Sequence, residues 1–186
     1  MAAVARLRGH AFMEFFGVTT MQYYDFYASP LGQILLVASD DALTGLHFVG
    51  EKYYPVIPPD WQRSNAKMIV TASKQLDEYF AGQRKNFDLA VDPTGTPFQR
   101  NVWQALRKIP YGVTTNYGTL AQRIGKPKAS RAVGAANGRN PISIVIPCHR
   151  VIGANGDLTG YAGGMARKES LLKLEANGRT EFQLTS

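Results

Sequence analysis

Residues 140–150 read NPISIVIPCHR and contain Cys148, the single cysteine of the 186-residue chain. The mostly apolar run from Ile142 to Ile146 predicts a short, buried, extended segment. Pro147 has no backbone N–H and disfavours helix in the residue before it, so the chain is expected to bend there. The stretch therefore predicts a thiol held where a buried element meets a turn. A lone cysteine is most often a small buried hydrophobe, so a chemical role needs support from the rest of the chain.

The cysteine count limits the kinds of site that the chain can build. One cysteine excludes an internal disulfide and a zinc site made of several thiolates, and it favours a reducing compartment. We expect no metal and no other cofactor. No apolar run approaches membrane-spanning length. Residues 1–20 lack the pattern of a secretory signal, so we expect a cytoplasmic protein that begins with an N-terminal extension.

Positive charge is confined to the half of the chain that contains the cysteine. The chain has 21 basic and 14 acidic residues. Residues 93–156 include no Asp or Glu but carry nine of the basic residues. The remainder, with 12 basic and 14 acidic residues, is slightly acidic. A basic surface is often only a solubility device. Its confinement to one acid-free segment favours a polyanion, and nucleic acid in particular, as the partner.

Residues 21–93 are expected to form a small α+β scaffold domain. Apolar runs separated by turn residues predict three strands, at residues 22–28, 33–38 and 43–49. A proline-rich loop at 52–60 leads to a helix that Ser64 can cap and Gly82 can end. Phe87, Leu89 and Val91 alternate with polar or small residues, as in a half-buried strand.

Residues 94–178 change to a helical pattern, which suggests a second domain. Thr96 is expected to cap a helix that starts at Pro97 and is ended by Pro110 and Gly112. Two short helices follow, at residues 117–124 and 129–136, closed by Gly125 and Gly138. Such a pair resembles a helix-turn-helix, although similar pairs occur in proteins that never touch DNA. The second helix is expected to place Ala and Gly on its inner face and its basic residues outward.

A last helix is expected from Ala166 to Ala176, ended by Gly178, with residues 179–186 as a tail. Glu175 shares the inward face of this helix with Leu171 and Leu172. A carboxylate on an apolar face must be paired or hydrogen-bonded.

Cys148, His149 and Glu175 could together form a nucleophilic site. A thiol becomes a good nucleophile when a base removes its proton. Adjacent residues on a strand face opposite ways, so His149 would act through a water, and Glu175 could orient it. With no second cysteine, disulfide exchange is not expected. An acyl group on sulfur could be hydrolysed, whereas an alkyl group would form a stable thioether and each molecule would act once.

Several motifs closely resemble the O6-methylguanine-DNA methyltransferases, in their stand-alone bacterial form. The motifs are PCHRVIG at 147–153, GAANGRNP at 134–141, GYAGG at 160–164, IPYG at 109–112 and GKPK at 125–128. The resemblance covers about residues 21–178. It implies an α+β fold with a small antiparallel-sheet, ribonuclease H-like N-terminal domain and a mainly helical, winged-helix-like C-terminal domain.

The resemblance also implies a function and a set of roles. Cys148 would accept the alkyl group of O6-methylguanine, and also of O4-methylthymine, in an irreversible single transfer after base flipping. His149 and Glu175 would keep Cys148 a thiolate, Asn140 would hold the turn, and Tyr161 would donate its hydroxyl to the guanine. Tyr117 would press on a phosphate, and Arg131 would replace the flipped base. Further DNA contacts are expected from Lys128, Ala129, Ala132, Gly134, Ala135 and Arg139, and the base pocket from Val151, Ala162 and Gly163.

The implied partner is double-stranded DNA with an O6-alkylguanine, bound through the minor groove by a monomer. Ala162 stands where some relatives have a hydroxyl residue, so one hydrogen bond to the leaving group is expected to be absent. Two alternatives stay open: a non-catalytic winged-helix protein that binds alkylated DNA, and a cysteine hydrolase. The local signatures of familiar cysteine hydrolases are absent, and the basic half has no role in such an enzyme.

Overall fold

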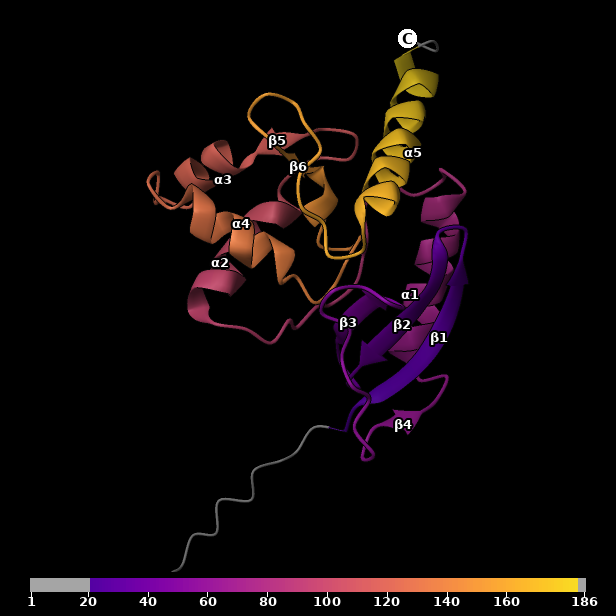
Figure 1. The fold of residues 1–186 in the computed structure, drawn as a ribbon. Helices are drawn as coiled ribbons and strands as arrows, with labels where there is room; N and C mark the ends of the chain where they lie inside the picture. Colours follow the sequence, from indigo (N-terminus) through magenta and orange to yellow (C-terminus); the bar gives the residue numbers. More distant parts are fainter. Residues whose placement is uncertain (1–20, 184–186) are drawn as a thin grey trace, which may run out of the picture.

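The computed structural model describes residues 21–183, with side chains described as far as residue 178. The expected N-terminal extension, residues 1–20, lies outside the described residues. A sheet with one helix packed on it forms one side of the molecule, a cluster of short helices forms the other, and a long C-terminal helix stands beside both (Figure 1). The predicted α+β class, with a sheet domain followed by a helical domain, is confirmed.

The sheet is an antiparallel meander with one short parallel strand added at its edge. Its strands are β1 (Tyr23–Ser29), β2 (Gly32–Ala38), β3 (Leu43–Phe48) and β4 (Gln62–Arg63). The order is β3-β2-β1-β4, and only the β1–β4 pair is parallel. The three strands predicted at residues 22–49 are confirmed to within one residue at each end. Central strand β2 is buried from Ile34 to Ala38, because it has a neighbour on each side and helix α1 packs on the sheet.

Helix α1 (Lys67–Phe80) begins later than predicted. Its N-cap is Ala66, and no side chain caps it. Ser64 does not act as the cap because its backbone N–H donates to the carbonyl of Tyr24, 3.0 Å away, at the end of the β1–β4 pairing. The predicted stop at Gly82 is confirmed, since this residue follows the C-cap with a φ of 74°.

The strand predicted at residues 87–91 does not form, although its burial pattern is correct. Leu89 is buried and its two neighbours are exposed, but only Val91 makes a bridge, to Leu43 at the start of β3.

The remaining edge of β3 is occupied by the segment before Cys148. The N–H of Leu46 donates to the carbonyl of Pro141 at 2.9 Å, and the carbonyl of Leu46 accepts from Ser143 at 3.0 Å.

The helical part contains α2 (Pro97–Arg107), α3 (Tyr117–Arg123) and α4 (Ser130–Gly138). Thr96 and Gln99 form a reciprocal capping box at the start of α2, which confirms the predicted cap. The helix ends at Arg107, three residues before the proline that was expected to end it. The N-cap of α3 is Asn116, which accepts from the N–H of Thr119 at 2.8 Å.

Helix α4 does not place its small residues as predicted. Its inner face is formed by Val133, Ala136 and Asn137, all buried, whereas Ala132 and Ala135 lie exposed beside the basic residues. The reason is that Trp103 of α2 fills the space beneath α4 and donates its indole N–H to the carbonyl of Ala136 at 2.9 Å.

The segment before Cys148 is buried as predicted, but it is not extended. Residues 142–146 form a bridge followed by turns, and Ile144 has a φ of 70°, which is uncommon for a β-branched residue. Cys148 then opens a single 3-10 turn, η1 (Cys148–Arg150). Strand β6 (Val151–Ile152) follows and pairs in parallel with β5 (Thr115–Asn116). This segment therefore connects β3 of the sheet with the start of α3.

Helix α5 (Met165–Gln183) is longer than predicted, because Gly178 does not end it and the first residues of the expected tail continue the helix. One cluster of buried side chains runs from the sheet through α1 and α2 to α5. No helix among residues 21–183 combines the length and apolar character needed to cross a membrane.

The capping box of α2 gives a test of the fold. Replacing Thr96 with Ala removes the side-chain acceptor for Gln99, and we expect the free energy of unfolding to fall by about 1 kcal/mol. Urea denaturation followed by circular dichroism measures this loss. The matched control is Thr114→Ala, because Thr114 is exposed and caps no helix. Equal losses in both variants would contradict the role of the capping box.

Candidate active site

Cys148 lies at the first position of η1, with only 4% of its surface exposed. Its sulfur is 3.0 Å from the amide Nδ2 of Asn140. The same amide donates to the carbonyl of Ile146 at 2.8 Å, and its oxygen accepts from the N–H of Ile142 at 3.0 Å. Asn140 thus holds both ends of the turn and places an N–H donor on the sulfur.

Burial is the main influence on the thiol and raises the pKa of Cys148 to about 11. The Asn140 amide and the Lys168 ammonium lower this pKa, and the Glu51 carboxylate raises it, but desolvation dominates. The sulfur of the free protein is therefore a protonated thiol at neutral pH. This differs from the expected resting thiolate, and a role as nucleophile would require the thiol to lose its proton first.

Glu175 is fully buried and accepts five hydrogen bonds. Two come from Arg150, at 2.9 Å each, which pairs with both carboxylate oxygens. The others come from the Tyr79 hydroxyl at 2.8 Å, the Gly112 N–H at 2.9 Å and the His149 ring at 2.8 Å. Desolvation opposes ionisation, but the His149 and Arg150 contacts outweigh it and lower the pKa of Glu175 to about 2. The side chain is therefore an anion at neutral pH.

His149 is fully buried, and its protonation follows from this anion. Desolvation lowers the pKa of His149, so the ring is neutral at pH 7. Nε2 faces the ionised Glu175 oxygen and must carry the ring proton. Nδ1 is left as an acceptor with no hydrogen-bond partner among the described residues. No hydrogen bond joins the Cys148 sulfur to this ring, as the sequence predicted. His149 can therefore take up a proton at Nδ1, but only through an intermediary such as water.

A cleft of about 500 Å³ opens beside this buried group. Its lining residues come from both halves of the chain: Lys52, Tyr53, Tyr117, Gly134, Ala135, Gly138, Thr159, Gly160, Tyr161 and Ala162. Five of them were predicted from the sequence, namely Tyr117, Gly134, Ala135, Tyr161 and Ala162. Cys148 is not among the residues that line the cleft.

Tyr117 is positioned by two close neighbours. Its hydroxyl accepts from Thr159 at 3.3 Å, and a Cβ on Gly134 would lie 3.6 Å from its ring. The β5–β6 pairing brings the start of α3 next to Val151, just after the cysteine turn. The helix pair is thereby fixed to the segment that carries the thiol.

Tyr161 links the cleft to the sulfur. Its hydroxyl is buried and has no hydrogen-bond partner of normal geometry in the described part of the chain. Burial, with the nearby Cys148 sulfur as the next contribution, holds the pKa of Tyr161 well above its ordinary value. The group therefore remains a phenol at neutral pH, with a hydrogen available to a bound molecule.

Val151 and Gly163 were predicted to form the base pocket, but both are buried and neither lines the cleft. Gly163 has a steric role, because a Cβ there would approach the Tyr161 ring to 2.7 Å. The carbonyl of Val151 accepts from the fully buried Lys168 ammonium at 2.6 Å.

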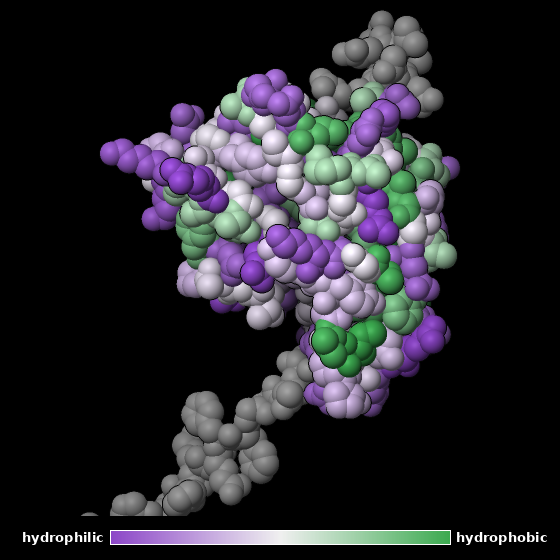
Figure 2. Space-filling model, in the orientation of Figure 1, coloured by the Kyte–Doolittle hydropathy of each residue, from purple (hydrophilic) through white to green (hydrophobic). Residues whose placement is uncertain are grey.

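The expected DNA-contacting residues on and before α4 lie on one side of the helix. Lys128, Arg131, Ala132, Ala135 and Arg139 are exposed, and Ala129 is half-buried. Figure 2 shows hydrophilic side chains projecting from the end of the molecule where Figure 1 places α3 and α4. The exposed alanines leave room between the cations for close approach of another surface.

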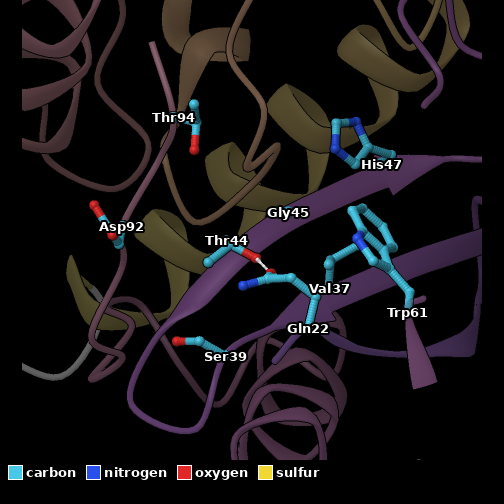
Figure 3. Close-up of a pocket in the computed structure, with 9 residues that line it drawn as sticks. All are labelled: Gln22, Val37, Ser39, Thr44, Gly45, His47, Trp61, Asp92 and Thr94. Atoms are coloured by element: carbon cyan, nitrogen blue, oxygen red, sulfur yellow. Dashed lines mark hydrogen bonds between the residues drawn. The ribbon is translucent and has the colours of Figure 1, made fainter. Parts of the chain in front are cut away.

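A second cleft, of about 440 Å³, lies over the sheet and contains none of the predicted site residues. His47, Trp61 and Asp92 are among its lining residues, and Thr44 donates to Gln22 within it at 2.7 Å (Figure 3). No group of three or more metal-ligating side chains occurs in the described residues.

Sequence reasoning missed Arg150, Tyr79 and Lys168. Arg150 was counted only as part of the positive charge, although it directly follows the Cys-His pair. Lys168 lies seven residues before Glu175 on the same helix face as Leu171, so helical spacing could have identified it. Tyr79 belongs to a distant helix, and no local signal connects it with Glu175.

Family comparisons agree with the resemblance seen in the sequence. The model of the "6-O-methylguanine DNA methyltransferase, ribonuclease-like domain" matches residues 22–93. The model of the "6-O-methylguanine DNA methyltransferase, DNA binding domain" matches residues 97–177. Together these two models account for most of the chain.

Individual relatives match over nearly their whole length. The methylated-DNA–protein-cysteine methyltransferase of Methanosarcina acetivorans is 53% identical over 155 residues, which is 83% of this chain and 99% of the relative. That of Mycolicibacterium paratuberculosis is 52% identical, covering 79% of this chain and 88% of the relative. The crystal structure of Mycobacterium tuberculosis OGT in complex with DNA superposes with a TM-score of 0.79 at 46% identity, covering 84% of this chain and 94% of that one.

The buried carboxylate gives a test of the site. Glu175→Gln leaves the Arg150 guanidinium buried without its counter-charge, so we expect the free energy of unfolding at pH 7 to fall by roughly 3 kcal/mol or more. The folded-state pKa of Glu175 is below its ordinary value, so its stabilising contribution is present above about pH 4.5 and is lost as pH falls toward 2. The variant should therefore lose stability less steeply than wild type in this range.

Urea denaturation from pH 7 to pH 3 measures both effects. The matched control is Glu169→Gln on the same helix, because Glu169 is exposed and its ion pair among the described residues is with the exposed Lys173. We expect this control to stay within about 0.5 kcal/mol of wild type. A Glu175→Gln protein as stable as the control would contradict the role assigned to the carboxylate.

Proposed function

The chain belongs to the 6-O-methylguanine DNA methyltransferase family, and on that premise we propose that it repairs DNA by moving the alkyl group of O6-methylguanine onto its own Cys148. The observation that carries the proposal is a buried thiol near Tyr161, a cleft residue whose buried hydroxyl has no hydrogen-bond partner of normal geometry among the described residues. The thiol is the nucleophile and the phenol is a hydrogen-bond donor for the departing base.

The reaction begins with the removal of the thiol proton. The pKa of about 11 keeps Cys148 protonated in the free protein. Through a bridging water, the proton passes to His149 Nδ1, the ring atom left as an acceptor. The resulting imidazolium is stabilised by Glu175, whose oxygen lies 2.8 Å from Nε2. The Asn140 amide, 3.0 Å from the sulfur, stabilises the thiolate as it forms.

The thiolate then attacks the methyl carbon of O6-methylguanine. A carbon–sulfur bond forms as the bond between the methyl carbon and O6 breaks, and the electron pair of that bond stays on the guanine. The Tyr161 hydroxyl donates a hydrogen bond to the base and so stabilises the charge that develops on it. Its raised pKa keeps it protonated for this task. A proton taken up by the guanine restores the normal base.

The product limits each molecule to one reaction. A thioether is not cleaved by water, and the described residues contain no second thiol that could accept the methyl group. The protein is therefore consumed stoichiometrically. O4-methylthymine presents the same alkyl–oxygen bond beside a ring nitrogen, and we include it as a second substrate.

The exposed face of α4 is the proposed DNA surface. Arg131 fills the space left by the extruded nucleotide, and Tyr117 presses on the neighbouring phosphate at the edge of the cleft. The small side chains of Ala132 and Ala135 allow the helix to enter the minor groove, while Lys128 and Arg139 contact the backbone. The Mycobacterium tuberculosis relative has a solved structure with DNA, which supports DNA as the partner.

We propose that the protein acts as a monomer on double-stranded DNA. Residues 21–93 serve as the scaffold, and residues 94–178 carry the DNA surface and the nucleophile. A buried thiol that must stay reduced fits a cytoplasmic location.

Mass spectrometry tests the transfer directly. We expect a duplex that contains O6-methylguanine to add one methyl group to the Cys148 peptide and to be repaired with a yield of no more than one per protein. Cys148→Ser should bind the duplex but accept no methyl group. Repair that continues beyond one equivalent would contradict single use, and an unmodified Cys148 would overturn the proposed function.

The role of Arg131 is separable from the chemistry. Arg131→Ala should slow transfer from a duplex by on the order of 10- to 100-fold, because unstacking a base costs a few kcal/mol. It should slow transfer from free O6-benzylguanine much less, because no base has to be extruded. Single-turnover rates measure both. Arg123→Ala, which removes an exposed arginine from α3, controls for the loss of one charge. Equal losses on both substrates would show that Arg131 is not the wedge.

A further inference from the structure

The loop after β3 reaches across to the cleft from the other half of the molecule. Lys52 and Tyr53 line the cleft together with Tyr117, Tyr161 and Ala162. The N–H of Lys52 donates to the carbonyl of Ala162 at 3.0 Å. The sheet domain therefore contributes a wall to a site whose reacting groups all belong to the helical domain.

This loop is held firmly at its start. Glu51 is buried and accepts from the Phe48 N–H at 3.1 Å, and its other oxygen lies 2.8 Å from Nδ1 of His47. The N–H of Tyr54 donates back to the Glu51 carbonyl at 3.2 Å. These contacts fix the backbone on either side of Lys52 and Tyr53, so the position of the Tyr53 ring is set by the fold.

The Tyr53 ring is also held from the helical domain. The guanidinium of Arg139, just after α4, lies over the ring, with its central carbon 4.0 Å from the ring centroid. The ammonium of Lys52 lies 5.4 Å from the same centroid. Stacking of this kind keeps an aromatic ring in one orientation. The ring therefore forms a fixed boundary of the cleft rather than a freely moving side chain.

The loop lies beside the part of the cleft that Tyr161 and Ala162 form. The carbonyl of Ala162 accepts from the N–H of Lys52, and Ala162 directly follows Tyr161, whose pKa is raised in part by the nearby Cys148 sulfur. A group carried on O6 and pointing toward Cys148 therefore approaches this end of the cleft, where Ala162 itself offers little bulk.

We propose that Tyr53 determines substrate size: its ring is the wall that limits how large an O6 substituent can be while its carbon still reaches Cys148. This role rests on the proposed alkyl transfer and adds a selectivity element from the sheet domain. Arg139 is the positioning residue that keeps the ring in place.

The test uses two duplexes that differ only in the O6 substituent, methyl or benzyl. Contacts to DNA are identical, so they cancel in the ratio of the benzyl rate to the methyl rate under single-turnover conditions. Tyr53→Ala should raise this ratio by roughly tenfold or more, which is the discrimination between substrates of different size that the shape of an enzyme pocket typically provides. Tyr53→Trp enlarges the wall and should lower it. Tyr53→Phe keeps the ring and should leave it unchanged.

Tyr54→Ala is the matched control, because Tyr54 is the next residue of the loop but does not line the cleft. Its ratio should equal that of wild type. The inference is overturned if Tyr53→Ala and Tyr53→Trp both leave the ratio of the benzyl rate to the methyl rate unchanged, even if they slow both reactions. A wild-type protein that accepts neither group would instead defeat the proposed function, so the two failures are distinguishable.

Discussion

The buried carboxylate of Glu175 is the interaction on which the active site depends. It joins α5 to the cysteine turn through His149 and Arg150, to α1 through Tyr79, and to the loop after α2 through Gly112. A charge without solvent must be neutralised and fully hydrogen-bonded, and these donors come from three separate parts of the chain. Correct placement of the nucleophile is therefore possible only when both halves of the molecule have folded around α5.

Much of this arrangement could be predicted from local patterns. The three strands of the meander alternate with clear turn residues, and the Thr96–Gln99 capping box is a purely local signal, so both were predicted correctly. Predictions failed where distant pairing decided the outcome. The backbone N–H of Ser64 bonds to strand β1, so Ser64 does not cap α1. The edge of β3 pairs with residues before Cys148, which leaves residues 87–91 a single bridge to that strand. No periodicity in the sequence contains that information.

The site residues also fall into those that local sequence patterns revealed and those that only the tertiary structure shows. Cys148, His149 and Asn140 lie within ten residues, and their motif revealed them. Glu175 was identified because a carboxylate on an apolar helix face needs a partner. Tyr53 was missed because it lies in a proline-rich loop with no periodic pattern of its own. Arg150 was missed because its charge suggested a residue on the surface. Only the tertiary structure shows that its guanidinium is buried against Glu175.

The protonated state of the resting thiol fits the proposed single use of each protein molecule. Burial raises the pKa of Cys148 to about 11, so the thiol form predominates at pH 7. A small electrophile in solution therefore finds almost no nucleophile, and the sulfur is also shielded by burial. In the proposed reaction, a base in the cleft presents its alkyl carbon to the sulfur, while His149 accepts the thiol proton through water and the Asn140 amide stabilises the thiolate. An exposed, permanently ionised cysteine would react faster, but any alkylating agent could consume it. Under the proposed function, burial thus makes the reaction depend on an extruded base, which is the selectivity that a protein used only once requires.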